Sequence, residues 1–194
     1  VAAMGAAQIG SLTTSQVASL TSTQVRGLST AQIVALNTSQ ISQLSVSGLT
    51  STQMAAIETA DLAQMTTSQI QSLTTTQVGA LTATQVAGLQ TTDVAALTTT
   101  QLGAIGTTAL RGLVPTQVAA LTTTQVAALT TTQVAGLAAT QVAALETTDI
   151  AALTTTQAGA LTTTQVAALG TAQLRGIETT DLAVLSTTQL RALG

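Results

Sequence analysis

The chain repeats an eight-residue unit over almost its whole length, and this period limits what it can fold into. From Leu121 the sequence reads Leu-Thr-Thr-Thr-Gln-Val-Ala-Ala, and the octad follows again from Leu129 with one Ala replaced by Gly136. We label the octad positions a to h, with Leu at a. One octad buries about two aliphatic side chains, too few to offset the ordering of eight backbone units. The repeat therefore predicts a solenoid, in which stacked neighbours share a continuous core.

Three octad positions are nearly invariant. Position a is apolar in every octad, from Met4 to Leu44 and from Leu49 to Leu193. Position f is also apolar throughout, and Ala158 is its one small residue. Position e is Gln in most octads, and the exceptions are Asp61, Asp93, Asp149, Asp181 and Ala109.

One octad is shortened. Between Leu44 and Leu49 stand only Ser45-Val46-Ser47-Gly48, so three residues and the Gln are missing. We interpret residues 45–48 as a shortened turn that kinks the array or offsets its register. The sequence thus predicts N-terminal octads over 1–44, a break at 45–48 and C-terminal octads over 49–194.

The octad carries the signature of a helix start. Position b is mostly Thr, Ser, Asn or Gly, the preferred N-cap residues. Gln or Asp follows three residues later and completes a capping box, while apolar a and f have the spacing of a hydrophobic staple. Each octad is therefore predicted to begin one short helix.

Three other features agree with this helix register. Pro115, the only proline, falls at c, the first helical position, where its missing N–H costs nothing. All seven acidic residues lie at b or e and all four Arg at g, the distribution that the helix dipole favours. Gly is frequent at h, where we expect it to end the helix.

A β-solenoid is the alternative architecture. Thr and Val are β-branched, and an even period would keep each side chain on one face of a strand. However, a and f have opposite parity, so a strand would place Leu and Val on opposite faces, and Pro115 would remove a ladder hydrogen bond. The predicted fold class is all-α, a solenoid of very short helices with one helix per octad.

The spacing of the charged octads bears on the superhelix. Acidic octads that contain Glu58 and Asp93 are separated by four octads, as are those that contain Glu146 and Glu178. This spacing suggests four octads per superhelical turn.

The composition excludes most functional chemistry. The chain has no Cys, His, Lys, Trp, Tyr or Phe, and charged residues make up 6% of it, with a net charge of −3. Without a basic footprint we expect no nucleic-acid partner. Apolar runs are interrupted by Thr, Ser or Gln, so no transmembrane segment is predicted. We predict no enzyme activity and no catalytic, cofactor-binding or metal site.

The acidic pairs are the nearest approach to a catalytic constellation. Carboxylates stand three residues apart in Glu58/Asp61, Glu146/Asp149 and Glu178/Asp181. We interpret them as first-turn charges that oppose the helix dipole. No aromatic, His or Lys side chain stands nearby to shift a pKa, and no dense Asp/Asn/Gly loop supplies the oxygens that calcium requires.

Hydroxyl residues form the remaining signal. Positions b, c and d place three adjacent Thr or Ser residues on most octads. Helix capping and solvation explain them. The alternative function is a binding module whose Thr stripe contacts a glycan, a cell surface or ice.

The octads of 121–137, and their degenerate forms elsewhere, resemble the octapeptide tracts of large bacterial secreted or surface proteins of the adhesin or extracellular-filament type. The resemblance implies an extracellular or cell-surface location and a structural role, and it transfers no functional residue. Because the chain begins at Val1 and shows no signal peptide, we expect a fragment or processed segment. The resulting hypothesis is a structural repeat segment that forms a rod-like or self-assembling filament, with copies of itself as partners and no cofactor.

Overall fold

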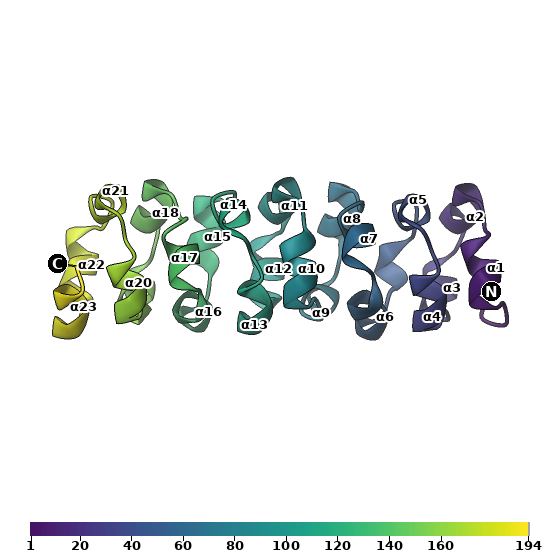
Figure 1. Cartoon of the computed structure of the whole chain (residues 1–194), viewed down its shortest axis with the longest axis horizontal. Helices are drawn as coiled ribbons and strands as arrows, with labels where there is room; N and C mark the ends of the chain where they lie inside the picture. The colour runs from purple at the N-terminus through teal and green to yellow at the C-terminus, as the bar shows by residue number, and fades with distance from the viewer. Residues whose placement is uncertain (194) are drawn as a thin grey trace. The chain divides into compact units, whose positions relative to one another are not determined.

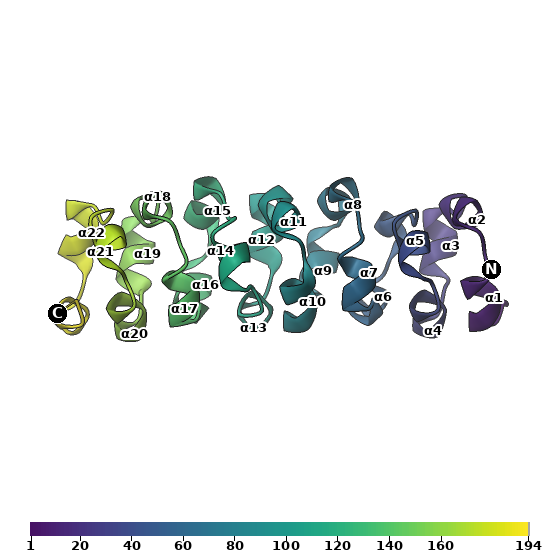
Figure 2. The ribbon, with the colours of Figure 1, turned by 45° about the horizontal axis from the view of Figure 1, so that its top comes forward.

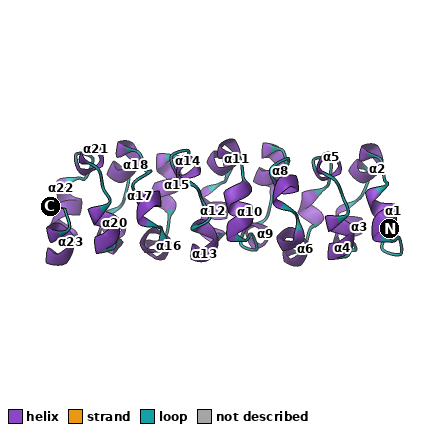
Figure 3. Ribbon diagram, viewed as in Figure 1, coloured by secondary structure: helices purple, strands orange, loops and turns teal. Residues whose placement is uncertain are grey.

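The computed structural model describes residues 1–193. Over this range the chain forms 23 short α-helices and one 3-10 helix, and no strand (Figure 3). The predicted all-α solenoid is confirmed, and the β-solenoid alternative is wrong. By packing, the chain divides into two compact units, Val1–Ile105 and Gly106–Gly194, each considered by itself below.

The first unit contains thirteen helical elements, one for each octad. They are α1 (Ala6–Gly10), α2 (Thr14–Ala18), α3 (Ser22–Arg26), α4 (Thr30–Val34), α5 (Thr38–Ile41), η1 (Val46–Gly48), α6 (Ser51–Ala56), α7 (Thr59–Leu62), α8 (Thr67–Ser72), α9 (Thr75–Val78), α10 (Ala83–Gly88), α11 (Thr91–Ala96) and α12 (Thr99–Ala104).

The described part of the second unit contains eleven helices. They are α13 (Thr107–Leu110), α14 (Pro115–Val118), α15 (Thr123–Ala128), α16 (Thr131–Gly136), α17 (Ala139–Val142), α18 (Thr147–Ala151), α19 (Thr155–Ala160), α20 (Thr163–Ala167), α21 (Thr171–Leu174), α22 (Thr179–Val184) and α23 (Thr187–Arg191).

Within each unit a helical element packs against the third element along the chain. In the first unit α1 packs on α4, α2 on α5 and α7 on α10, and in the second α13 packs on α16 and α20 on α23. Successive helices therefore occupy three sides in turn (Figures 1 and 2). Each superhelical turn contains three octads, so the suggestion of four octads per turn was wrong. The acidic octads are consequently spread over different sides.

The helices begin as their caps predict. Position b is the N-cap with extended backbone, as at Thr130 (φ −70°, ψ 155°). Its hydroxyl accepts a hydrogen bond from the Gln133 N–H at 3.1 Å, and the Gln133 side chain accepts one from the Thr130 N–H at 2.9 Å. Pro115 occupies the first position of α14. The capping register is confirmed.

Glycines at h do lie at helix ends, as at Gly27, Gly88 and Gly136, but none of them ends its helix with a left-handed backbone. Among residues 1–193 no glycine has positive φ. A helix instead closes with a bond from the a-position N–H to the f-position carbonyl, as from Leu137 to Val134 at 3.2 Å, and Leu137 then turns extended (φ −62°, ψ 147°). At Gly176 glycine also permits close packing, because a Cβ there would lie 2.6 Å from the carbonyl oxygen of Thr147.

The core consists of the a and f side chains. Position f is the more deeply buried, with no exposed surface at Val17, Val78, Val126 or Val142. The small f residue Ala158 borders an apolar cavity of only about 10 Å³. The repeat therefore packs tightly with aliphatic side chains alone.

The shortened octad fills one side of a superhelical turn with η1. This 3-10 helix packs against α3 of the preceding turn and against α8 of the following turn. A Cβ on Gly48 would lie 2.7 Å from the Ser22 Cα, and the Ser47 hydroxyl lies 3.2 Å from that of Ser22. Three elements per turn are thus kept on both sides of residues 45–48, inside the first unit. The division of the octads at this segment stays a prediction.

Among the described residues, no helix has both the length and the apolar character needed to cross a bilayer.

Candidate functional site

Most of the e-position glutamines are buried, which is unusual for a polar side chain of this size. Gln40 and Gln165 are 1% exposed, and Gln117, Gln141 and Gln157 are 2% exposed. Because buried polar groups require hydrogen-bond partners, each amide must be paired inside the solenoid.

The oxygen of the amide caps the start of the helix to which the glutamine belongs. The Oε1 atom of Gln165 accepts a hydrogen bond from the N–H of Thr162 at 2.7 Å. The same bond forms where b has no hydroxyl, as from the N–H of Val114 to Gln117 at 2.8 Å and from that of Ala138 to Gln141 at 2.8 Å.

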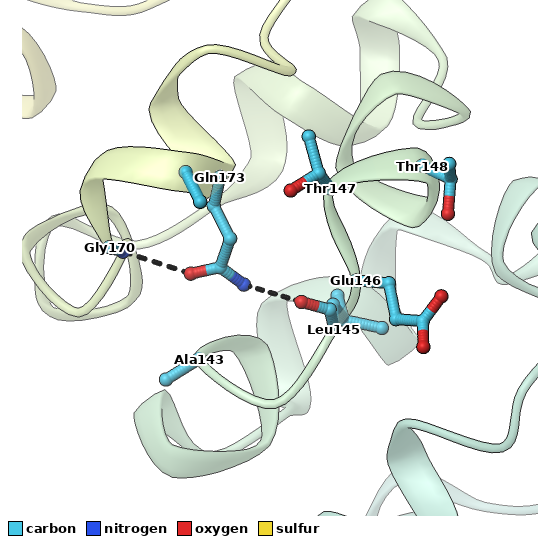
Figure 4. Close-up of a pocket in the computed structure, with 8 residues that line it drawn as sticks. Ala143, Leu145, Glu146, Thr147, Thr148, Gly170 and Gln173 are labelled. Carbon is cyan, nitrogen blue, oxygen red and sulfur yellow. Dashed lines mark hydrogen bonds between the residues drawn. The ribbon is translucent and has the colours of Figure 1, made fainter.

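The other half of the amide binds the preceding superhelical turn. The Nε2 atom of Gln165 donates to the carbonyl oxygens of Val134 at 2.7 Å and Leu137 at 2.8 Å. These carbonyls lie at the end of α16, four helices earlier, and the Val134 carbonyl also accepts the closing bond from the Leu137 N–H at 3.2 Å. In Figure 4 the Gln173 amide lies between the Gly170 N–H and the Leu145 carbonyl, at 2.9 and 2.8 Å.

We call this array the glutamine ladder. Its members are the e-position glutamines whose Nε2 atoms donate to backbone carbonyls of the preceding turn: Gln32, Gln40, Gln53, Gln69, Gln77, Gln85, Gln101, Gln141, Gln157, Gln165, Gln173 and Gln189. The ladder passes the shortened octad, since Gln69 donates to Leu44 at 3.0 Å and Gln77 to Leu49 at 2.7 Å. It joins successive turns in the same way within each unit.

The glutamines of the first described superhelical turn lack the hydrogen bond that Nε2 donates to a preceding turn. Gln8, Gln16 and Gln24 are exposed, and within residues 1–193 their Nε2 atoms have no hydrogen-bond partner. Their Oε1 atoms still accept from the N–H groups of their own N-caps, at 2.7 to 2.8 Å. The helix starts are therefore complete while the amide donors face solvent.

The ladder was missed by sequence reasoning, although a signal for it exists. A capping box accepts Glu as readily as Gln, and the helix dipole favours Glu in the first turn. The repeat nevertheless has Gln at e almost throughout. Only the amide adds a donor to the acceptor that capping requires, and this preference indicates a second set of partners.

The four octads with Asp at e depart from this arrangement. Asp61, Asp93, Asp149 and Asp181 are 6%, 2%, 2% and 3% exposed, whereas Glu58, Glu146 and Glu178 at b are exposed. The aspartates lie in the first turns of their helices, as expected, but they are buried there. A carboxylate accepts but cannot donate, so it cannot replace the ladder bond.

Burial also changes how these aspartates titrate. It raises the pKa of Asp61, Asp93 and Asp149, because burial penalises the charged form. At Asp93 the Thr67 hydroxyl donates to Oδ1 at 3.1 Å, while Oδ2 is buried with no partner among the described residues. Burial is the main cause of the raised pKa at all three aspartates, and the negative charge of Glu58 or Glu146 raises the pKa of Asp61 and Asp149 further. The pKa values are therefore shifted without an aromatic, His or Lys neighbour.

The two carboxylates of an acidic pair lie in different surroundings, as Glu146 and Asp149 show. Near Glu146 an open hollow is lined by Ala143, Leu145, Glu146, Thr147, Thr148, Gly170, Ala172 and Gln173 (Figure 4). The Glu146 carboxylate points away from the Gln173 amide, and its partner Asp149 lies in the interior. Within residues 1–193 no group of three or more metal-ligating side chains occurs. What this geometry can do is hold successive turns together.

Comparison with known proteins points to one repeat family. A family model described as the ALTTAQ repeat matches in six stretches that together span more than half of the chain, at residues 18–46, 54–91, 86–123, 104–139, 118–147 and 142–176. Its six letters correspond to octad positions h, a, b, c, d and e, which contain the core Leu, the N-cap and the ladder Gln. No curated protein matches the chain.

The ladder bond can be tested by changing its donor alone. Gln165→Glu keeps the acceptor for the Thr162 N–H but places a carboxylate against the carbonyls of Val134 and Leu137. We expect a loss of about 2–4 kcal/mol in the free energy of unfolding at pH 7, since buried polar groups are left unpaired. The matched control is Gln16→Glu, whose amide is exposed, and it should change stability by less than about 0.5 kcal/mol. Equal losses in urea unfolding would contradict the ladder.

The buried aspartates predict a stability that depends on pH. Because the pKa of Asp61, Asp93 and Asp149 is raised in the folded state, the folded chain binds their protons more tightly than the unfolded chain does. Their contribution to the free energy of unfolding is therefore complete below the ordinary Asp pKa and is lost as the pH rises through the raised values. Stability should increase when the pH falls from 7 into this window.

The triple variant Asp61→Asn/Asp93→Asn/Asp149→Asn is the test of this dependence. It should be more stable than the wild type at pH 7 and should lack the increase in acid, as measured by urea unfolding at several pH values. Parallel pH profiles of the two proteins would rule out the aspartates as the cause.

Proposed function

The chain belongs to the ALTTAQ repeat family, and we propose that it is a structural repeat segment of an extracellular or cell-surface protein that self-associates into a rod-like or filamentous assembly and performs no catalysis. The observation that carries this proposal is the glutamine ladder. Its amides use their polar atoms in joining one superhelical turn to the next, and they leave none directed at a substrate.

The surface chemistry supports a structural role. The charged side chains are few and scattered, and the net charge is −3 over 194 residues. Weak net charge reduces the repulsion between copies, which favours association. A repeat that grows by adding octads without changing its contacts also suits a spacer or filament.

A binding module with a threonine face is the second candidate, because position d is exposed along each side. On one side of the second unit α14, α17, α20 and α23 pack in succession, and their d-position residues are Thr116, Thr140, Thr164 and Thr188. The c-position methyl groups are less accessible to a ligand because they pack close to the next turn. At the c-position residue Thr107, the Cγ2 atom would lie 3.1 Å from a Cβ on Gly136. The name of the family has Ala at d, whereas most octads of this chain have Thr or Ser there. A hydroxyl at d is therefore not shared by every ALTTAQ-type repeat, and we favour the structural role.

Self-association is tested with the whole chain. Sedimentation velocity over a range of concentrations should show a weight-average mass that rises with concentration, and electron micrographs of the concentrated protein should show filaments. A chain that stays monomeric at millimolar concentration would refute the assembly part of the proposal.

The second candidate predicts binding that depends on one side of the second unit. Ice binding, measured as thermal hysteresis, or retention on immobilised polysaccharide should be lost in Thr116→Ala/Thr140→Ala/Thr164→Ala/Thr188→Ala. The same change on the neighbouring side, at Thr108, Thr132, Thr156 and Thr180, is the matched control. Failure of the wild type to bind either probe would exclude this function for these probes.

A further inference from the structure

Backbone oxygens converge at the helix ends that the glutamine ladder joins. The Nε2 atom of Gln157 lies 3.0, 3.2 and 2.6 Å from the carbonyl oxygens of Val126, Ala127 and Leu129, which stand at positions f, g and a. One point is thus surrounded by three carbonyl oxygens, and the ladder amide fills it with N–H donors. Where the amide is missing, such a point suits a cation that prefers oxygen ligands.

The amide is missing in the aspartate octads, and carbonyls that it would pair are left free. A ladder glutamine reaches the g- and a-position carbonyls 30 and 28 residues before it. For Asp149 and Asp181 the same spacing selects four carbonyls, and within residues 1–193 none of them accepts a hydrogen bond. They belong to Ala119, Leu121, Ala151 and Leu153.

The aspartate side chains are buried beside these carbonyls without a positive partner. Asp93 reaches the preceding turn, where the Thr67 hydroxyl donates to its Oδ1 at 3.1 Å and its Oδ2 has no partner among the described residues. Asp61 and Asp181 are 6% and 3% exposed, and within residues 1–193 neither side chain makes a hydrogen bond. Buried charges in proteins are normally paired or bound to a metal, so these carboxylates indicate a missing ligand.

Position b changes together with position e. Every octad with Asp at e has Glu or Gln at b, and no other octad has either residue there. Gln90 shows how far this longer side chain reaches, because its Nε2 donates to the g-position carbonyl of Ala63 in the preceding turn at 2.7 Å. In the other three octads b is Glu, which has a similar reach but no hydrogen to donate.

The two carboxylates of a Glu/Asp pair influence each other. After burial, the negative charge of Glu58 or Glu146 is a further cause of the raised pKa of Asp61 and Asp149. Figure 4 shows the Glu146 carboxylate directed away from Gln173, which belongs to the following turn. A cation between the two carboxylates and the preceding turn would relieve their repulsion.

We propose that each octad with Glu at b and Asp at e binds a calcium ion between two superhelical turns. The ligands are the two carboxylates of one turn and the free g- and a-position carbonyls of the preceding turn. The three sites combine Glu58 and Asp61 with Val34 and Leu36, Glu146 and Asp149 with Ala119 and Leu121, and Glu178 and Asp181 with Ala151 and Leu153.

The chemistry of these ligands selects calcium. Carboxylates and carbonyls are hard oxygen ligands, and the two carboxylates neutralise the charge of one divalent ion. They supply about four to six oxygens, and water at the exposed b position completes the six to eight that calcium takes. No local calcium loop is required, because the preceding turn supplies the remaining oxygens. The ion takes the place of the ladder bond.

The sites are tested by the effect of calcium on unfolding of the whole chain. With dissociation constants of roughly 10⁻⁴–10⁻³ M, about 10 mM CaCl₂ should raise the folding equilibrium constant roughly tenfold or more per site in urea unfolding. The logarithm of this constant, plotted against the logarithm of the calcium concentration, should approach a slope of about three, one ion per site. Equal effects of CaCl₂ and of NaCl at the same ionic strength would overturn the inference.

One substitution converts a proposed site into the arrangement of the octad without Glu. Glu146→Gln recreates the pair formed by Gln90 and Asp93, and its amide should donate to the Ala119 carbonyl. The variant should be at least as stable as the wild type without calcium, and its slope should fall to about two. The matched control is Asp93→Asn, which also removes one charge but from an octad without Glu, and it should keep the slope of the wild type.

The outcomes separate a site within the chain from other effects of calcium. An equal fall of the slope in Glu146→Gln and Asp93→Asn would assign the response to net charge and overturn the sites. A response that grows with protein concentration would place the ion between copies and would also overturn them. The inference does not rest on self-association, because one copy holds all the ligands. A monomeric chain with a slope of about three would support calcium binding while refuting assembly.

Discussion

The structure depends on the two-sided hydrogen bonding of one carboxamide. A helix of four to six residues leaves most of its backbone groups without intrahelical partners, and stacking such helices buries these groups away from water. The Gln165 amide resolves this conflict, because its oxygen serves the start of one helix and its nitrogen serves the ends of another. Aliphatic packing supplies the hydrophobic stabilisation, but the amide makes the burial of so many helix termini tolerable.

The elements that the sequence predicts are those with local causes. The N-cap at Thr130, the first-turn position of Pro115 and the core positions a and f all follow from contacts within one octad. The three-octad turn does not, because it is set by contacts between residues more than twenty positions apart, such as Gln85 and Ile57. The recurrence of acidic octads was a poor guide to this turn. It reflects where aspartate replaces glutamine, not which helices stack.

The candidate site was visible in the sequence, but only its capping role was predicted. A capping glutamine in an isolated helix is solvated, and only stacking reveals the donors that capping leaves unused. The same reasoning explains the aspartates. Asp149 serves its own helix, accepting from the Glu146 N–H at 3.1 Å, yet it supplies nothing to the preceding turn. An aspartate octad of this kind therefore keeps the hydrogen bond that caps its helix start, but it lacks the ladder's hydrogen bond to the backbone carbonyls of the preceding turn.

The ladder also gives each unit a direction. Every donor belongs to the later turn and every acceptor to the earlier one, as with Gln53 and Leu28 or Gln173 and Leu145. A stack built from such bonds is polar along its axis, because the amide donors point toward earlier turns and the carbonyl acceptors toward later ones. This polarity is a consequence of choosing glutamine over a purely acceptor side chain, since an acceptor alone could not donate to the preceding turn.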